Sequence, residues 1–193
     1  MKEEIHVMLD LETLGNRINP VLVQISAVTF SFEEEIETKE FNVLVDDNSC
    51  AEIGLEYSQS TLDWWKEQAP DEAQAKVFDP KGRLLIEEAL LQFAKFIKEL
   101  RKEYNTVYLH GNGIRADNVW LLSAFKAAGL DDPVAYNEDL DFRTLHYLAK
   151  KKLGYNVKDT IQFEGIPHNA IDDCKFQIAC AKAMYKALMG GYL

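Results

Sequence analysis

Ile5-His6-Val7-Met8-Leu9-Asp10-Leu11-Glu12 is the stretch that decides the fold, an apolar run that ends in two carboxylates. Successive side chains of a strand point to opposite faces, so Asp10 and Glu12 point to the same face. Two carboxylates about 4 Å apart repel by roughly 4 kcal/mol at an effective dielectric constant near ~20. A fold tolerates this repulsion when a cation lies between the two groups or when one of them is protonated. The pair therefore predicts a site for a hard divalent metal ion with oxygen ligands. The competing interpretation is a solvated strand end, in a chain with 32 acidic residues.

The composition bounds the class of protein. With 193 residues, of which 47% are apolar and 27% charged, the chain is expected to form one globular domain over residues 1–193. No apolar stretch approaches the roughly 18 residues of a membrane span, and the N-terminus lacks a signal-peptide pattern. Its three cysteines are too few and too scattered for a disulfide framework or a zinc site. We therefore expect a cytoplasmic protein without a membrane partner.

The net charge of the chain limits the ways in which it can bind nucleic acid. A formal net charge of −11 argues against a protein that coats nucleic acid through a broad basic face. It does not exclude an enzyme that meets phosphates locally through bound metal ions, whose charge reverses the local field.

The patterns around the first stretch predict an α/β fold. Residues 5–11 are expected to form a buried strand, and residues 21–30 and 35–45 to form a hairpin after it. A further short strand is expected at 106–109, followed by a turn at 110–113. Helices are expected at 60–69, 83–103, 117–128, 142–152 and 169–188. This order of elements indicates a mixed β-sheet flanked by helices.

The last of these helices carries two neighbouring acids. The apolar stripe expected to face the core consists of Ile171, Cys174, Ile178, Ala181, Tyr185 and Leu188. On a helical wheel Asp173 lies about 110° from the centre of this stripe, and Asp172 lies about 150° from it. Asp173 is therefore expected at the border of the packed face, and Asp172 nearer to solvent.

Three segments resemble, in the same order, the motifs of the DEDD 3′–5′ exonucleases in their histidine subtype (DEDDh). They are Asp10-Leu11-Glu12-Thr13, His110-Gly111-Asn112-Gly113-Ile114-Arg115-Ala116-Asp117-Asn118 and His168-Asn169-Ala170-Ile171-Asp172-Asp173. Segments 10–15, 60–66 and 168–174 are most similar to the branch that contains exonuclease A of T-even bacteriophages and small bacterial 3′–5′ exoribonucleases. The resemblance covers nearly the whole chain and implies the RNase H-like fold. The doubled acid at 172 and 173 departs from the pattern, but the His-x(4)-Asp spacing from His168 and the wheel both favour Asp173.

The resemblance implies a metal-dependent 3′–5′ exonuclease that releases nucleoside 5′-monophosphates from single-stranded ends. The expected ligands of two Mg²⁺ or Mn²⁺ ions are Asp10, Glu12, Asp117 and Asp173. His168 is expected to take the proton from the attacking water, because imidazole titrates near neutral pH. The alternative for His168 is a helix cap without a chemical role.

Contacts with the substrate are harder to assign. The candidate residues are Leu11, Thr13, Asn112, Trp65 and Arg143. Trp64 and Trp65 are adjacent on a helix and cannot both pack the same way, so one is expected in the core while the other is available to stack a base. Arg143 is expected to pair with a phosphate or with Asp141.

Two rival functions stay open. We expect DNA ends as the favoured substrate. RNA overhangs are the first rival, because no residue of the sequence can be identified as a contact with the 2′-hydroxyl that distinguishes RNA. The second rival is a catalytically silent module that binds nucleic acid or another subunit. The intact set of acids and His168 argues against it, since a binding module has no use for a cluster of repelling charges. The sequence leaves open whether the chain forms a homodimer.

Overall fold

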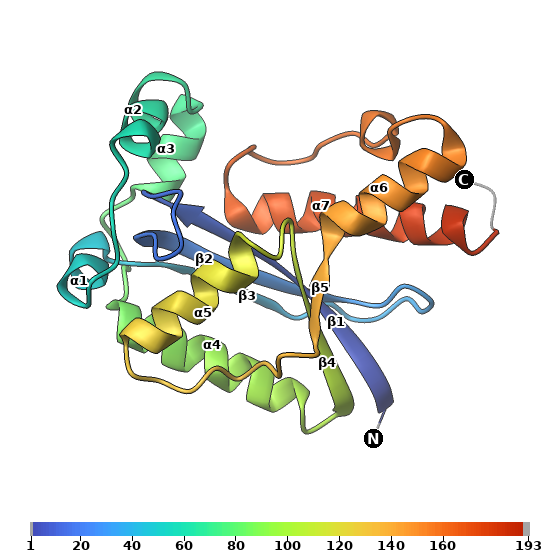
Figure 1. The fold of residues 1–193 in the computed structure, drawn as a ribbon, viewed down its shortest axis with the longest axis horizontal. Coiled ribbons are helices and arrows are strands. Elements are labelled where there is room, and N and C mark those ends of the chain that lie inside the picture. Colours follow the sequence, from blue (N-terminus) through green and yellow to red (C-terminus); the bar gives the residue numbers. More distant parts are fainter. Residues whose placement is uncertain (1, 191–193) are drawn as a thin grey trace.

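A mixed five-stranded sheet lies at the centre of the protein, with the strand order β3-β2-β1-β4-β5 (Figure 1). This computed structural model describes residues 2–190. The strands are β1 (Lys2–Thr13), β2 (Leu22–Phe30), β3 (Glu40–Leu44), β4 (Tyr104–Gly111) and β5 (Asp139–Asp141). Since β1 pairs antiparallel with β2 and parallel with β4, the sheet contains both strand directions. The predicted α/β fold class is confirmed.

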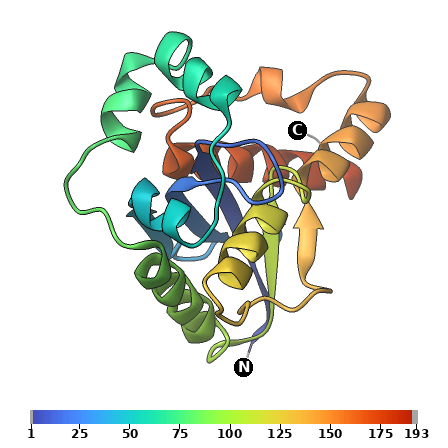
Figure 2. The same ribbon diagram turned by 60° about the vertical axis from the view of Figure 1, so that its left-hand side comes forward.

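Helices cover both faces of this sheet. They are α1 (Asp47–Glu52), α2 (Gln59–Glu67), α3 (Asp71–Val77), α4 (Ile86–Leu100), α5 (Asp117–Ala127), α6 (Phe142–Leu153), the 3₁₀-helix η1 (Val157–Thr160) and α7 (Ala170–Leu188). In Figures 1 and 2, α6 and α7 lie on one face of the sheet, and α4 and α5 lie on the other. None of the helices within residues 2–190 has both the length and the apolarity to cross a bilayer.

The alternation of β1 divides the core in two. Leu9 packs with Phe93 and Phe125 beneath α4 and α5, whereas Met8 packs with Phe142 and Met184 beneath α6 and α7. Because successive side chains alternate along a strand, the acids of β1 share the face of Met8 and point toward α7. The strand thus delivers two carboxylates to one side of the sheet while its apolar residues secure both sides.

Most of the expected elements are present, and the errors have local causes. The strand expected at 35–45 is shorter, since β3 begins at Glu40 and the preceding residues are mostly exposed. α1 and α3 were not predicted, because each is too short for a helical periodicity to show. His110 and Gly111, expected in a turn, are the last residues of β4.

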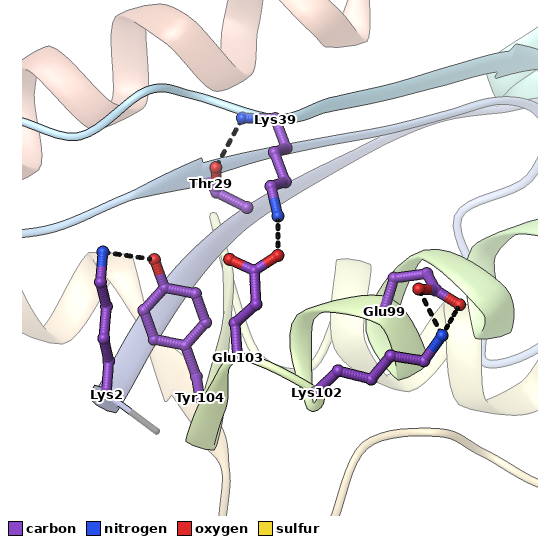
Figure 3. A network of polar contacts seen from close by, with 7 residues as sticks. All are labelled: Lys2, Thr29, Lys39, Glu99, Lys102, Glu103 and Tyr104. Carbon is purple, nitrogen blue, oxygen red and sulfur yellow. Dashed lines mark hydrogen bonds and ion pairs between the residues drawn. The ribbon is translucent and has the colours of Figure 1, made fainter.

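Polar contacts join the elements at the end of the sheet where β1 begins (Figure 3). The ammonium of Lys2 donates to the Tyr104 hydroxyl at 3.5 Å, and the ammonium of Lys39 forms an ion pair with Glu103. The backbone N–H of Lys39 donates to the Thr29 hydroxyl at 2.7 Å. Exposed ion pairs of this kind contribute little to stability, typically less than about 1 kcal/mol. Asp10 and Glu12 lie at the opposite end of β1.

Candidate active site

Four carboxylates from three elements meet at the C-terminal end of β1. Asp10 and Glu12 come from β1, Asp117 is the first residue of α5, and Asp173 lies in the first turn of α7. The parallel pairing of β1 with β4 places the start of α5, which follows β4, beside the end of β1. Asp10, Glu12 and Asp117 are buried, and Asp173 is half-buried. The structure therefore brings together the four acids that the sequence selected.

Burial and mutual repulsion disfavour the ionised form of these acids. Burial, followed by the charges of Asp117, Glu12 and Asp173, raises the pKa of Asp10 well above its usual value. Burial, followed by the charges of Asp173 and Asp117, raises the pKa of Glu12 well above its usual value. Burial raises the pKa of Asp117 to about 6, although backbone N–H groups, Gly113 first, oppose the rise. Without a cation this cluster holds protons at pH values where isolated carboxyl groups have lost them.

The donor set of the cluster fits a divalent metal ion. One ligand atom each from Glu12, His168 and Asp173 lie within 4.8 Å of one another. A cation among the carboxylates would relieve the repulsion that raises their pKa values. Carboxylate oxygens are the ligands that Mg²⁺ and Mn²⁺ prefer. The residues at this site therefore form a candidate metal-binding group of the oxygen-rich type.

The orientation of Asp10 is held from the neighbouring helix. Nε2 of Gln177 donates to Oδ1 of Asp10 at 2.7 Å, and both side chains are buried. Gln177 lies one helical turn after Asp173, so α7 supplies both an acid of the cluster and a donor to another acid. The sequence did not identify Gln177, although a polar residue four positions after a candidate metal ligand was an available signal.

His168 is held at the mouth of the cluster in an unusual backbone conformation. Its φ is +64°, the only positive φ of a non-glycine residue within residues 2–190. Its backbone N–H donates to Oδ2 of Asp173 at 2.8 Å, and its imidazole packs edge-on against Trp64 with ring centroids 4.8 Å apart. The residue is exposed, so its ring is accessible from solvent. Strained backbone of this kind persists where surrounding contacts over-determine it, and it concentrates at functional sites.

Asp172 and Asp173 have different partners. Oδ2 of Asp172 accepts the backbone N–H of Ile166 at 3.0 Å and Nδ2 of Asn169 at 2.8 Å. Asp172 therefore clips the turn over 165–169 to the start of α7, and this turn presents His168. Asp173 is directed instead to the acidic cluster, where its charge raises the pKa of Glu12.

The buried face of α7 differs from the predicted stripe. Ile178, Tyr185 and Leu188 are only half-buried, whereas Gln177, Cys180 and Met184 are buried. Ile171, Cys174 and Ala181 are buried as predicted, so half of the stripe is right. Hydropathy alone excluded Gln177, whose Nε2 donates to Asp10. With the helix rotated in this way, Asp173 lies on the sheet-facing side between Ala170 and Gln177.

The assignment of Trp65 to the substrate was wrong. Trp65 is 4% exposed, and its indole N–H donates to the carbonyl oxygen of Thr13 at 2.9 Å. It packs in the core, and Trp64 is the tryptophan that lies beside His168. The side chain of Leu11 also packs in the core, and the Thr13 hydroxyl donates to the carbonyl oxygen of Gly15. Neither side chain is therefore free to contact a substrate.

The other candidates lie near the cluster. Asn112 is half-buried in the turn after β4, and Arg143 is exposed with its guanidinium against Gly113. Asp141 does not pair with Arg143, because its carboxylate accepts the backbone N–H groups of Ile114 and Thr144.

His110, which stands in the second motif, is not part of the cluster. Its Nε2 lies 2.8 Å from Nδ1 of His6, and both imidazoles are buried. Burial lowers the pKa of His110 to about 3, so this pair stays uncharged at neutral pH.

Comparisons with known proteins agree with this geometry. Residues 5–185 match the model of a family described as the 3′-5′ exoribonuclease Rv2179c-like domain. No curated protein matches the sequence at a significant level. The resemblance to DEDDh exonucleases is thereby confirmed at the level of the family.

Solved structures share the fold at low sequence identity. Cell-death related nuclease 4 (CRN-4) has a TM-score of 0.66 at 13% identity, over 97% of this chain and 65% of that chain. The nuclease domain of 3′hExo, a DEDDh family member bound to rAMP, has a TM-score of 0.57 at 17% identity, over 96% of this chain and 92% of that chain. E. coli exonuclease I in complex with a dT13 oligonucleotide has a TM-score of 0.62 at 16% identity, over 97% of this chain and 42% of that chain. The chain thus spans just under two thirds of CRN-4 and less than half of exonuclease I. These likenesses show the RNase H-like fold.

Proposed function

Because the chain belongs to the Rv2179c-like family of 3′–5′ exoribonuclease domains, we propose that it shortens single-stranded RNA from the 3′ end. Each turnover releases one nucleoside 5′-monophosphate and leaves a 3′-hydroxyl on the shortened strand. The observation that carries this proposal is the convergence of Asp10, Glu12, Asp117 and Asp173 next to His168. A module that only binds a partner gains nothing from such repelling charges, which destabilise the fold.

The carboxylates are assigned to the metal ions that such a cluster fits. Asp10, whose pKa is raised by the charges of the other three acids, would hold the ions together with Glu12, Asp117 and Asp173. Two bound Mg²⁺ or Mn²⁺ ions would neutralise the phosphoryl oxygens, lower the pKa of the attacking water and stabilise the leaving oxygen. Gln177 keeps the Asp10 carboxylate in one orientation through its 2.7 Å hydrogen bond.

His168 is assigned the role of general base. Its imidazole is exposed, and one of its nitrogens lies within 4.8 Å of carboxylate oxygens of Glu12 and Asp173. The imidazole accepts a proton from the attacking water, whose oxygen bonds to phosphorus. The bond from phosphorus to the 3′ oxygen breaks, and that oxygen ends as a hydroxyl with a proton from solvent. Asp173 and Trp64 fix the position of the residue from two sides.

The family description favours RNA over the DNA that the sequence alone suggested. RNA and DNA differ at the 2′-hydroxyl, which is the group a selective site would bind. Among structures of similar fold, one is described with a dT13 oligonucleotide and another with rAMP. The fold itself therefore does not decide between the two sugars, and the family membership is what favours RNA.

A gel assay tests the proposal directly. Single-stranded RNA and DNA of one sequence, each labelled at the 5′ end, are incubated with the protein in Mg²⁺ or Mn²⁺, with and without excess chelator. We expect a ladder of products that shorten by one nucleotide, formed faster from RNA and abolished by the chelator. The matched Asp10→Ala variant, purified identically, reveals any contaminating nuclease. Internal cleavage, or a ladder that persists in excess chelator, would contradict the proposal.

A further inference from the structure

Two cationic side chains lie beside the acidic cluster without an anionic partner. Lys158 extends from η1 and is half-buried, with its ammonium 4.7 Å from the centre of the Phe142 ring. Arg143 directly follows Phe142 in the first turn of α6. Within residues 2–190, neither cationic group forms an ion pair or a side-chain hydrogen bond.

Both cations lie against residues that build the site. The guanidinium of Arg143 packs on Gly113 so closely that a Cβ atom at that position would lie 3.1 Å from Nη1. The backbone N–H of the same Gly113 donates to Oδ2 of Asp117. On the other side, burial raises the pKa of Asp173, and Lys158 is among the positive charges that oppose the rise. Arg143 therefore lies on the Asp117 side of the cluster, and Lys158 lies on the Asp173 side.

An anion bound between these two cations would be stabilised by both of them. Burial and then the charge of Arg143 lower the pKa of Lys158, so the two cations lie near enough to repel. A half-buried ammonium that lacks a counter-ion is unfavourable, and an anion between the two cations would remove both costs. The carboxylates of the cluster do not serve as this anion, since none of them is within ion-pair distance of either cation.

We propose that Lys158 and Arg143 bind the phosphate one nucleotide upstream, on the 5′ side, of the bond that is cut. The subsite rests on the proposed function, because a strand whose 3′ end occupies the cluster brings its next phosphate to the edge of the cluster. The scissile phosphate belongs to the carboxylates, whereas the two cations lie outside them. Arg presents a planar fork of donors to a phosphate and Lys a point charge, so the pair suits one phosphodiester of a single strand.

Two dinucleotides isolate this single phosphate. One is a dinucleoside monophosphate, which carries only the scissile phosphate, and the other is the same molecule with a 5′-phosphate. We expect the unmodified protein to cleave the 5′-phosphorylated form with a kcat/KM roughly ten- to a hundredfold higher, the usual size of a hydrogen-bonded contact to a charged group. Lys158→Met keeps the packing on Phe142 but removes the charge, and Arg143→Gln removes the fork. In each variant this ratio should fall toward one, and Lys158→Arg should retain most of it.

The control and the contrary outcomes are specific. Lys126→Met, the same substitution at an exposed lysine in the last turn of α5, should keep the full ratio. If the unmodified protein cleaves both dinucleotides equally well, or if both variants slow the two substrates by the same factor, the upstream subsite is wrong. If the unmodified protein cleaves neither, the proposed function fails instead.

A binding measurement tests the subsite without turnover. The affinity of a 5′-fluorescein-labelled single-stranded RNA is measured by anisotropy over a range of salt concentrations, with Asp10→Ala to prevent cleavage. When a cation that neutralises one phosphate of a single strand is removed, the slope of log K against log salt becomes shallower by about 0.7. We expect that decrease when Lys158→Met or Arg143→Gln is added, and none when Lys126→Met is added. An unchanged slope in both added variants would overturn the proposal.

Discussion

Asp172 and Asp173 are neighbours in the chain, yet their carboxylates serve different parts of the molecule. Asp172 accepts two N–H donors from the turn over 165–169, and Asp173 acts on the buried acids of β1. A difference of 100° around a helix is enough to separate an acid that holds the turn from an acid that we propose as a metal ligand. Conservative substitutions at the two positions would distinguish these roles.

We expect Asp173→Asn to reduce kcat by more than about 100-fold. Mutation of a residue that only hydrogen-bonds to a metal ligand typically costs about 10- to 100-fold, and a change to the ligand itself should cost more. Asp172→Asn should stay within about tenfold of the unmodified rate, since its amide oxygen still accepts the N–H of Ile166. Asp172→Ala should lose more than Asp172→Asn, because the turn is then unclipped. Steady-state rates on a 5′-labelled single strand check the order. The reverse order at 172 and 173 would show that the metal ligand was assigned to the wrong acid.

Asp10→Ala should reduce the cleavage rate by at least about 100-fold, while the protein still folds. Repulsion between Asp10 and the other three acids is removed, so the melting temperature of the metal-free variant should equal or exceed that of the unmodified protein. Removal of the hydrogen bond from Gln177 offsets part of this gain. Cleavage assays and thermal melts in chelator test both halves. Near-normal turnover by Asp10→Ala would contradict the assignment of the metal site.

His168 combines an imidazole that we propose as the general base with a strained backbone, and two variants separate these two properties. General-base help is typically worth 10²–10⁴-fold, so His168→Ala and His168→Gly should both lose roughly that factor in single-turnover cleavage. His168→Gly should melt higher than His168→Ala, because glycine adopts the φ of +64° without strain. If the loss in rate is under tenfold and follows the melting temperature, the residue is a structural cap without a role as base.

At the scale of elements, the site depends on how α7 begins. The turn over 165–169 contains two residues with positive φ, Gly165 at +109° and His168 at +64°. A Cβ atom at Gly165 would lie 2.5 Å from Cγ of Asp172, so this position leaves no room for a side chain beside the clip. Gln24 supports the same turn from β2, since its amide donates to Asn169 and accepts the N–H of Ala170. The position of His168 is therefore set by the turn, which is held from a helix and a strand.

Gly165→Ala tests this dependence. The methyl group collides with Asp172, so we expect a loss of rate of about tenfold or more with a modest decrease in melting temperature. Gly129→Ala is the matched control, because Gly129 also has a positive φ, +68°, but has no atom within 4 Å of a built Cβ. That variant should lose on the order of 1 kcal/mol of stability and keep its turnover. Equal loss of activity in both variants would mean that the turn does not position His168.

At the scale of the whole molecule, the acidic cluster couples folding to pH and to metal. Burial raises the pKa of Asp117 from 3.8 to about 6, so between these values the folded protein binds more protons than the unfolded chain. Stability must then fall as pH rises through this window, by roughly 3 kcal/mol for a shift of this size. Asp10 and Glu12 act in the same direction. A divalent cation bound to the folded state opposes this fall.

Thermal melts in chelator should therefore show a lower melting temperature at pH 7.5 than at pH 5, and excess Mg²⁺ or Mn²⁺ should reduce the difference. Asp117→Asn removes one of the titrating groups and should flatten the pH dependence of the metal-free protein. A melting temperature that rises from pH 5 to 7.5 in chelator, for the unmodified protein, would show that the cluster does not carry raised pKa values.

The sequence by itself determined the features that depend on local patterns. The alternation of β1 placed Asp10 and Glu12 on one face, and the helices predicted at 117–128, ended by Gly129, and at 142–152 correspond closely to α5 and α6. Asp10 and Glu12 could be selected from strand alternation, whereas Asp117 and the full set of four acids came from the resemblance to the DEDDh motifs. Local patterns do not need a distant partner, which explains why the predicted strand and helices agree with the structure.

Only the tertiary structure decided how distant residues meet. The hydrogen bond between Gln177 and Asp10 depends on how α7 packs against β1. The burial of Trp65 depends on how α2 packs against the end of the same strand. The same packing rotated α7 away from the stripe that hydropathy predicted and brought Lys158 near Asp173. Hydropathy reports the average cost of burying a side chain, whereas the burial of one polar group, such as the amide of Gln177, depends on the partner that packing supplies.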